Sequence, residues 1–484
     1  MPGLVDVPIA AIGLECFEAV LSAEQMEAAR AAVRRVRAGF DGRRVWNVNS
    51  TARGGGVAEM LNALMPYVRG SGIDVRWVVM EGDDEFFRVT KRIHNHLHGS
   101  PGDAAELGDA ERARYGAVTA ARAEELCDLV EPGDVVVLHD PQTAGLVPAL
   151  RGRGVHVVWR CHVGLDLPNR LARNAWAFLL PYVTQADACV FSRRAYAWDC
   201  LESDRITVIP PSIDPFSAKN APLDREQVRA ILSAARVDAG NGSNTARFRR
   251  RHGGEDTIRH RAQVVEESPV EADTPLVVQV SRWDALKDPA GVVDGFVRHV
   301  AGRSDAHLML AGPSVDEVAD DPEGAETYRD VRRRWERLPA RLRARVHLAC
   351  LPMRDDEENG AMVNALQRRA QVVVQKSLAE GFGLTVAEAM WKARPVVATR
   401  IGGIQDQVEH GTTGLLVDDP RDLAAFGEAV SSLLREPERA EAMGEAAQAR
   451  VRDQFLGTRH LAQFADLLSG LVERSRREAR TAAG

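Results

Sequence analysis

Short apolar runs alternate with longer stretches of helical periodicity along most of the chain. In the first half the runs are 45–50, 75–80, 134–138, 155–160, 188–191 and 206–209. A second series occupies 276–280, 307–311, 346–348, 372–375, 396–398 and 414–417. Strands that alternate with helices favour a parallel sheet with helices on both faces. The pattern therefore predicts an α/β protein.

The turn at 210–215 separates the two series, which predicts two Rossmann-like domains facing each other across a cleft. We place the first domain at 1–215, with an N-terminal helical extension that includes a helix at 21–39. The second domain is placed at 216–460, and a C-terminal helix at 461–484 is expected to pack back toward the first domain. Parallel sheets bind ligands outside the carboxyl ends of their strands, so the loops that follow the strands are the candidate sites.

Residues 238–273 differ from the rest of the second half. The stretch is rich in glycine, arginine and acidic residues, and Phe248 is its single aromatic residue. Such a segment can bury little apolar surface, so we expect a mobile surface insertion. Its arginines at 247 and 249–251 fit either a solvated loop or a contact with an anionic partner.

Composition and charge narrow the class of protein. Hydrophobic residues make up 45% of the 484 residues, which allows large cores. A net charge of −7 argues against a nucleic-acid partner. The N-terminus lacks the features of a signal peptide and no run is long enough to span a membrane. Because the six cysteines form no Cys-x-x-Cys pair, we expect reduced thiols in a cytoplasmic protein.

The segment EGFGLTVAEAM, which begins at Glu380, contains a glycine loop that follows the strand at 372–375. Backbone N–H groups from Phe382, Gly383, Leu384 and Thr385, together with the positive end of the next helix, would bind an anion. Glu380 and Glu388 are eight positions apart and would both face the cleft, where carboxylates bind sugar hydroxyls. The alternative is an ordinary strand-to-helix turn with an N-terminal glutamate.

Two further loops carry groups suited to phosphates. In VSRWDALKDP, Arg282 supplies a planar fork and Lys287 a mobile point charge, and both could converge on a diphosphate; the alternative is a solvated charge pair. Gly54, Gly55 and Gly56 lie between a strand and a helix and would let a phosphate or a sugar approach the backbone closely. The triple glycine is not Gly-x-Gly-x-x-Gly, and the Walker A motif is absent.

Polar residues also follow two strands of the first half. His139, Asp140 and Gln142 follow one strand, and Arg160 and His162 end the next. A lone buried histidine is usually structural, but two such clusters favour an acceptor-binding site. The sequence contains no His-Glu-x-x-His, no cysteine metal spacing and no Asp-x-Asp. We therefore predict no metal and no cofactor, with the leaving group stabilised by Arg282, Lys287 and backbone N–H groups.

Seven segments, in order, make the chain resemble the retaining GT-B glycosyltransferases of family four, and more narrowly the trehalose glycosyltransferring synthases of bacteria and archaea. The resemblance covers about residues 41–470 and rests on VWNVNSTARGGGVAEML, LHDPQ, WRCH, PPSIDP, VSRWDALKDP, SLAEGFGLTVAEAMWK and ATRIGGI. It implies an acceptor domain at 1–215 and a nucleotide-sugar domain at 216–460. The insertion at 238–273 departs from the family pattern.

The resemblance also implies roles for individual residues. Arg282 and Lys287 would hold the donor diphosphate, Glu388 the ribose, and Glu380 the hydroxyls of the transferred glucose. His162 and Asp140 would lie at the reaction centre with Glu380. The remaining donor contacts would come from Gly54, Gly55, Gly56, Phe382, Gly383, Leu384 and Thr385, and the acceptor contacts from Asn49, His139, Gln142 and Arg160.

By this resemblance, the enzyme would join ADP- or UDP-glucose to free glucose and form trehalose reversibly, with retention by front-face attack. Its partners would be these small molecules, with no membrane, and a homodimer is a further expectation. Three alternatives stay open: a trehalose phosphorylase, transfer to a phosphorylated glucose, and a non-enzymatic sugar- or nucleotide-binding regulator. The nucleotide, the physiological direction and the role of the insertion are also left open.

Overall fold

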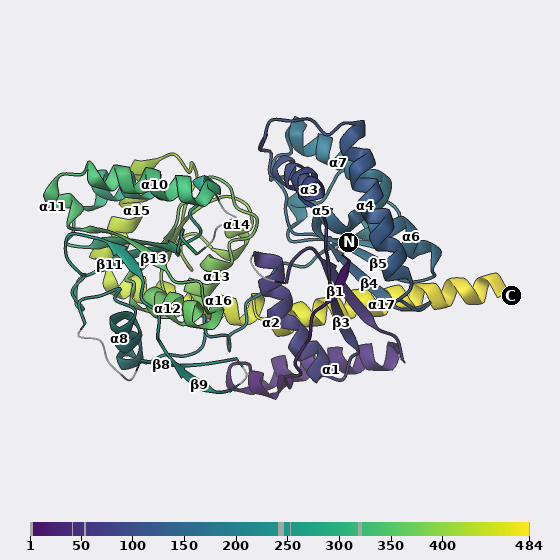
Figure 1. The fold of residues 1–484 in the computed structure, drawn as a ribbon. Coiled ribbons are helices and arrows are strands. Elements are labelled where there is room, and N and C mark those ends of the chain that lie inside the picture. Colours follow the sequence, from purple (N-terminus) through teal and green to yellow (C-terminus); the bar gives the residue numbers. More distant parts are fainter. Residues whose placement is uncertain are drawn as a thin grey trace. The chain divides into compact units, whose positions relative to one another are not determined.

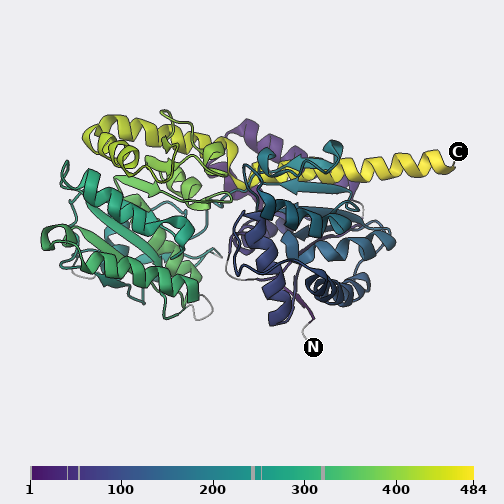
Figure 2. The same ribbon diagram turned by 90° about the horizontal axis from the view of Figure 1, so that it is seen from above.

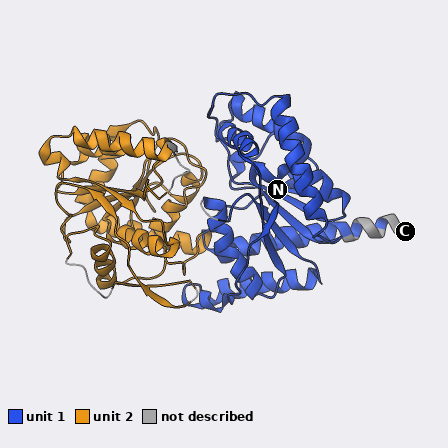
Figure 3. Cartoon of the chain, viewed as in Figure 1, with its two compact units in different colours: residues 1–212, 455–484 blue, residues 213–454 orange. Residues whose placement is uncertain are grey.

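The computed structural model describes residues 3–40, 42–52, 55–240, 246–251, 253–317 and 322–483. The chain forms two compact units (Figure 3): residues 1–212 together with 455–484, and residues 213–454. The last helix, α17 (Gly457–Ala483), belongs to the first unit and packs beside α1 (Ala23–Gly39), as Figures 1 and 2 show.

The first unit is built on a seven-stranded sheet in the order β1-β3-β2-β4-β5-β6-β7. The edge strand β1 is antiparallel to β3, and the sequence pattern did not predict this strand. The strands are β1 (Leu4–Asp6), β2 (Val45–Asn49), β3 (Val75–Met80), β4 (Val135–His139), β5 (His156–Cys161), β6 (Ala188–Phe191) and β7 (Ile206–Val208).

Alternating side chains of these strands form two cores, one on each face of the sheet. In β4, Val136 and Leu138 belong to the core on one face, whereas Val135 and Val137 belong to the core beneath α1, α2 and α17. The former face is covered mainly by α3, α4 and α7. The remaining helices of this unit are α2 (Gly56–Gly70), α3 (Asp84–Leu97), α4 (Asp109–Cys127), α5 (Asp140–Thr143), α6 (Val147–Gly152) and α7 (Arg170–Val183).

The helix predicted at 21–39 is observed as α1 and has a reciprocal cap at its start. The Gln25 N–H donates to Ser22 Oγ at 3.2 Å, and the Gln25 side-chain oxygen accepts from the Ser22 N–H at 3.0 Å. This arrangement satisfies two donors that a helix start would otherwise leave without partners.

The second unit also has a seven-stranded sheet, in the order β10-β13-β12-β11-β14-β15-β16. The edge strand β10 is antiparallel to β13. The strands are β10 (Gln263–Val265), β11 (Leu276–Val280), β12 (His307–Pro313), β13 (Val346–Leu351), β14 (Val372–Gln375), β15 (Val396–Thr399) and β16 (Leu415–Val417). The prediction of an α/β protein with two Rossmann-like sheets is confirmed.

Helices cover both faces of this second sheet (Figure 1), with α10 and α15 on one side and α8 and α12 on the other. The helices are α8 (Arg225–Ala234), α9 (Pro289–Gly295), α10 (Pro322–Glu336), α11 (Ala340–Arg343), α12 (Asp356–Arg369), α13 (Leu384–Trp391), α14 (Ile404–Gln407), α15 (Leu423–Arg435) and α16 (Pro437–Gln454). Short 3₁₀ turns occur in the chain at Leu14–Ala19, Ala144–Leu146, Arg194–Tyr196, Ser203–Arg205 and Ala285–Lys287, and a π-turn at Phe296–Val300.

The expectation of a loop insertion at 238–273 needs correction for its described part. A hairpin of β8 (Arg247–Arg249) and β9 (Glu255–Thr257) is followed by β10, which pairs with β13 in the main sheet. Phe248 is 3% exposed. Residues 241–245 and 252 lie outside the described residues. The segment is therefore part of the second unit and contributes a strand to its sheet.

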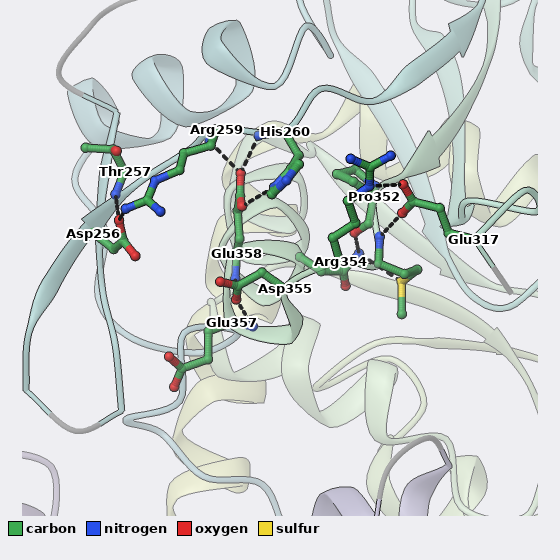
Figure 4. A network of polar contacts seen from close by, with 12 residues as sticks. Asp256, Thr257, Arg259, His260, Glu317, Pro352, Arg354, Asp355, Glu357 and Glu358 are labelled. Carbon is green, nitrogen blue, oxygen red and sulfur yellow. Dashed lines mark hydrogen bonds and ion pairs between the residues drawn. The ribbon is translucent and has the colours of Figure 1, made fainter.

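Charged contacts hold this segment against the N-terminus of α12 (Figure 4). Glu358 is only 3% exposed, and its carboxylate accepts the N–H groups of Arg259 at 2.6 Å and His260 at 2.7 Å. His260 Nδ1 lies 2.7 Å from the other oxygen of Glu358. Arg250 pairs with Asp256 at 2.7 Å and with Glu357 at 3.0 Å. Polar contacts here take the place of the apolar burial that the composition lacks.

Candidate active site

The strand order of each sheet reverses at one point, and the candidate residues cluster there. In the first sheet the chain passes from β2 to β3 on one side and continues with β4 on the other side of β2. In the second sheet β11 has β12 on one side and β14 on the other. Ligands of parallel α/β sheets bind at the carboxyl ends of the strands flanking such a reversal. We call these positions the first and second switch points.

At the first switch point, β2 ends at Asn49 and is followed by the glycine loop. Asn49 Oδ1 accepts a hydrogen bond from Trp77 Nε1 at 2.8 Å, and its amide nitrogen donates to the Thr51 carbonyl at 2.6 Å. Gly55 has φ +85°, in the region that favours glycine, and a Cβ there would meet no atom within 4 Å. Gly56 begins α2, whereas Gly54 lies outside the described residues. The described loop leaves room for close approach to its backbone.

An asparagine of β2, a histidine of β4 and a histidine that follows β5 form a hydrogen-bonded row. His139 Nε2 lies 3.1 Å from Asn47 Oδ1, and His139 Nδ1 lies 3.0 Å from His162 Nε2. The two imidazole planes are 18° apart. Burial lowers the pKa of both histidines well below the usual value, and the positive charge of Arg160 lowers it further. Both rings are therefore neutral near pH 7.

Asp140 follows β4 in a left-handed conformation with φ +63°, which is uncommon for a residue with a side chain. Two contacts hold it there: its Oδ1 accepts the His162 N–H at 2.7 Å, and its carbonyl accepts from Trp159 Nε1 at 3.1 Å. Burial raises the pKa of Asp140 to about 7, although the hydrogen bond from His162 and the charge of Arg160 act in the opposite direction. This carboxyl group can therefore exchange a proton near neutral pH.

The structure changes the interpretation of Arg160. Its side chain is 1% exposed, and its guanidinium lies 2.8 Å from His460 Nε2 on α17 and donates to the Ile209 carbonyl at 3.2 Å. Because Arg160 is buried and contacts His460 and the Ile209 carbonyl, this geometry does not support the expected contact with an acceptor. Gln142 lies in α5, one turn beyond His139, and is partly exposed.

At the second switch point, an ion pair joins the loops that follow β11 and β14. Lys287 Nζ lies 2.6 Å from Glu380 Oε2, and the side chains are 17% and 9% exposed. Ser377 Oγ is 3.3 Å from the same glutamate oxygen. The Gln279 amide donates to the Lys287 carbonyl at 3.0 Å and so holds the lysine backbone. A cation and a carboxylate are thus fixed side by side at the expected position.

The glycine loop at 381–383 leads into α13. Gly383 has φ +84°, and a Cβ there would lie 3.1 Å from Ile404 Cγ1. The Gln407 amide donates to the Phe382 carbonyl at 2.5 Å, and the Gly403 N–H donates to the Gly381 carbonyl at 2.9 Å. The first N–H groups of a helix have no partner within it. Leu384 and Thr385 begin α13, so the predicted anion-binding loop does open a helix.

Within the described part of the chain, Glu388 and Arg282 have other partners than Lys287. Glu388 is 2% exposed, and its Oε1 lies 3.5 Å from Lys219 Nζ. The Arg282 side chain is 65% exposed and pairs with Asp284 at 3.3 Å. Both residues nevertheless belong to segments that begin at the second switch point.

Sequence reasoning missed several residues that contact the candidate groups, among them Asn47, Ser377 and His460. Asn47 could have been found, because it is two positions from Asn49 in a strand and so shares its face of the sheet. Ser377 directly follows β14, where polar residues were expected. No local pattern indicates that His460 meets Arg160, since the two are 300 positions apart.

Within the described ranges, no group of three or more His, Cys, Asp and Glu side chains could hold a metal ion. In the same ranges, no helix has the length and apolar character that a membrane crossing requires.

Comparison with known proteins agrees with the fold. Residues 47–198 match the family model "Trehalose synthase, N-terminal domain", and residues 261–450 match "Glycosyl transferases group 1". A solved E. coli structure titled "Trehalose-6-phosphate from E. coli bound with UDP-2-fluoro glucose" covers 88% of this chain and 99% of its own, with a TM-score of 0.65 and 14% identity. The chain is a group 1 glycosyltransferase with the GT-B fold.

Two relatives define the family more narrowly. The trehalose synthase of Rubrobacter xylanophilus is 36% identical over 436 residues, which are 89% of this chain and 91% of that protein. The trehalose synthase of Thermococcus litoralis is 33% identical over 460 residues, which are 94% of this chain and 96% of that protein. The chain belongs to the trehalose synthase family.

Proposed function

We propose that this enzyme transfers glucose from a nucleoside diphosphate glucose to free glucose, with retention, and that it forms trehalose reversibly. Membership of the trehalose synthase family supports the product. The observation that carries the donor assignment is the Lys287–Glu380 pair at the second switch point, where the ammonium and carboxylate are 2.6 Å apart. A nucleotide sugar has a charged diphosphate next to a neutral sugar, which matches this juxtaposition.

We assign the donor to the second unit. Lys287 would contact the diphosphate, and Glu380 would accept hydrogen bonds from the glucose hydroxyls. The N-terminus of α13 would add backbone N–H groups from Phe382 to Thr385, with Glu388 on the ribose and Arg282 as a second cation. The similarly folded E. coli protein is described as bound to UDP-2-fluoro glucose, which favours a nucleotide-sugar donor. UDP- and ADP-glucose remain the two candidates.

We assign the acceptor to the first unit, to the groups around His162 and Asp140. Carboxyl, amide and imidazole groups exchange hydrogen bonds with neutral sugar hydroxyls. A phosphorylated acceptor would require guanidinium or ammonium groups to offset its charge. Among the predicted acceptor residues, Arg160 is the sole guanidinium, and it is held by His460 and Ile209. This favours free glucose over glucose 6-phosphate.

Retention is proposed to follow from front-face attack without a metal ion. The bond between the anomeric carbon and the diphosphate breaks while the acceptor hydroxyl oxygen bonds to the same carbon. The hydroxyl proton passes to the departing diphosphate oxygen. Lys287 and the N–H groups at the start of α13 would stabilise the charge that develops on the leaving group, the kind of contribution that dominates many enzymatic rate enhancements.

A product assay tests the proposal. UDP-, ADP- and GDP-glucose are each offered with glucose, glucose 6-phosphate or fructose at equal concentration, and trehalose is separately offered with inorganic phosphate. Trehalose and a nucleoside diphosphate formed from free glucose are the expected products. Preference for glucose 6-phosphate would overturn the acceptor assignment. Glucose 1-phosphate released from trehalose without nucleotide would identify a phosphorylase, and binding without product would identify a regulator.

A further inference from the structure

In the row Asn47–His139–His162, the chemistry of the groups determines which atom donates and which accepts in each hydrogen bond. We propose that Asn47 and His139 act as positioning residues that fix the proton of His162 on Nε2 and leave its Nδ1 free to accept a hydrogen bond from a sugar hydroxyl. The first part concerns the ligand-free protein. The second part rests on the proposed function, because it requires His162 to contact the sugar.

The direction starts at Asn47, which is 4% exposed. Its amide nitrogen faces Met65 Sδ at 3.3 Å, and its oxygen faces His139 Nε2 at 3.1 Å. A carbonyl oxygen can only accept a hydrogen bond, so His139 Nε2 must carry the proton. In a neutral imidazole the other nitrogen is then an acceptor. His139 Nδ1 therefore accepts, and His162 Nε2, 3.0 Å away, must donate.

These donor and acceptor roles apply when both rings are neutral, and the surroundings of the rings favour that state. Burial lowers the pKa of His139 and His162, and the positive charge of Arg160 acts in the same direction. The charged and titratable groups around the pair are Arg160, Asp140 and His460. Asp140 Oδ1 accepts a hydrogen bond from the backbone N–H of His162 at 2.7 Å, rather than from the His162 imidazole. A doubly protonated His139 would direct an N–H group at the His162 N–H.

The tautomer of His162 determines whether a bound sugar hydroxyl donates or accepts the hydrogen bond with the imidazole. With the proton on Nε2, His162 presents a lone pair at Nδ1, so a bound hydroxyl must donate to it and keeps its own lone pairs for other contacts. The opposite tautomer would present an N–H group at Nδ1 and reverse this arrangement. A histidine fixed in one tautomer by a second residue is thus selective for the orientation of the hydroxyl, as well as for its presence.

Nitrogen NMR of the ligand-free protein tests the row without any substrate. Histidine labelled with ¹⁵N in both ring positions distinguishes protonated from unprotonated nitrogens, and a His162→Gln variant identifies the His162 signals among the 13 histidines. We expect His162 to show a protonated Nε2 and an unprotonated Nδ1 across pH 6 to 8. A proton on Nδ1, or an imidazolium in this range, would overturn the proposal.

Variants distinguish a role of Asn47 and His139 in setting the His162 tautomer from a role in packing alone. Asn47→Leu removes the acceptor at similar volume and should give a mixture of His162 tautomers, as should His139→Leu. His139→Asn should keep the His162 proton on Nε2, because the amide oxygen takes the place of Nδ1. The matched control is Asn62→Leu, an exposed position in α2 whose amide lies 3.4 Å from the Ala52 carbonyl. An unchanged His162 tautomer in both Asn47→Leu and His139→Leu would refute the positioning role.

Steady-state kinetics then test the sugar contact. Asn47→Leu should lower kcat/KM for the acceptor about five- to tenfold, the effect of one neutral hydrogen bond, without changing donor affinity. His139→Asn should retain more acceptor turnover than His139→Leu. If the tautomer changes while acceptor kinetics do not, the proposed contact between His162 and the sugar fails. In that case the proton arrangement of the row still stands, so the two parts fail separately.

Discussion

Replacing Lys287 with alanine removes the cation that we assign to the donor diphosphate. The Lys287 ammonium lies 2.6 Å from Glu380, and both side chains are largely buried. Removal of one group that stabilises leaving-group charge costs about 10²–10³ in kcat. Removal of one member of a partly buried ion pair is expected to lower the free energy of unfolding by roughly 1–3 kcal/mol, between the values for exposed and buried pairs.

The assay combines nucleotide release with two controls for folding and binding. Initial rates at saturating donor give kcat, calorimetry gives the affinity for the nucleoside diphosphate, and thermal unfolding gives Tm. We expect kcat to fall by about two to three orders of magnitude while the cooperative unfolding transition is retained. The matched control is Lys91→Ala, because Lys91 is an exposed residue of α3 in the first unit.

Near-normal turnover in folded Lys287→Ala would refute the donor assignment. If the alanine variant does not fold, Lys287→Met provides the same test, because it removes the charge and keeps most of the side-chain volume. A variant that binds the nucleoside diphosphate as tightly as the parent and loses only turnover would limit the role of Lys287 to the transition state. A parallel loss of binding would indicate contact in the ground state as well.

Further predictions concern the metal, Asp140 and the hairpin. Treatment with EDTA should leave most transfer activity, and a loss that magnesium restores would contradict the metal-free proposal. Asp140→Asn should raise the acceptor KM more than it weakens donor binding. Because folding raises the pKa of Asp140 to about 7, the folded protein keeps a proton that the unfolded chain releases above about pH 4. The contribution of Asp140 to the free energy of unfolding should therefore fall from pH 4 to 7, and the difference in stability between the parent and Asp140→Asn should change over this range, as measured by denaturant titration. Glu358→Gln should lower the free energy of unfolding by about 2–3 kcal/mol and expose residues 246–260 to proteolysis, whereas the exposed Glu326→Gln should do neither.

The positions of the switch-point loops could be predicted from the sequence, because short apolar runs mark the strands and chemistry-bearing residues follow them directly. The Lys287–Glu380 contact is consistent with that reasoning, since both loops end neighbouring strands of one parallel sheet. The direction of Arg160 could not be predicted. The orientation of the Arg160 side chain depends on His460, which lies on a helix near the end of the chain. Because the two residues are 300 positions apart, no local sequence pattern predicts this contact. The antiparallel β1 was missed because three residues are too short a run to show alternation.

The hairpin shows why composition alone was an incomplete guide to residues 238–273. Low apolar content predicts mobility only if the charged side chains remain solvated. In this segment Arg250 instead pairs with Glu357 at the start of α12. Asp355 caps the start of α12 by accepting from the Glu358 N–H at 3.1 Å, and the Arg250 guanidinium lowers the pKa of Asp355 to about 2. Deleting 240–270 would remove Arg250 together with β10, and would leave Glu358 buried without three of its donors. Removal of the partners of a buried charge typically costs about 3–5 kcal/mol. Arg250, which a solvated loop would offer to an anionic partner, instead pairs with the acidic start of α12. The segment should therefore be treated as part of the second unit when variants are designed.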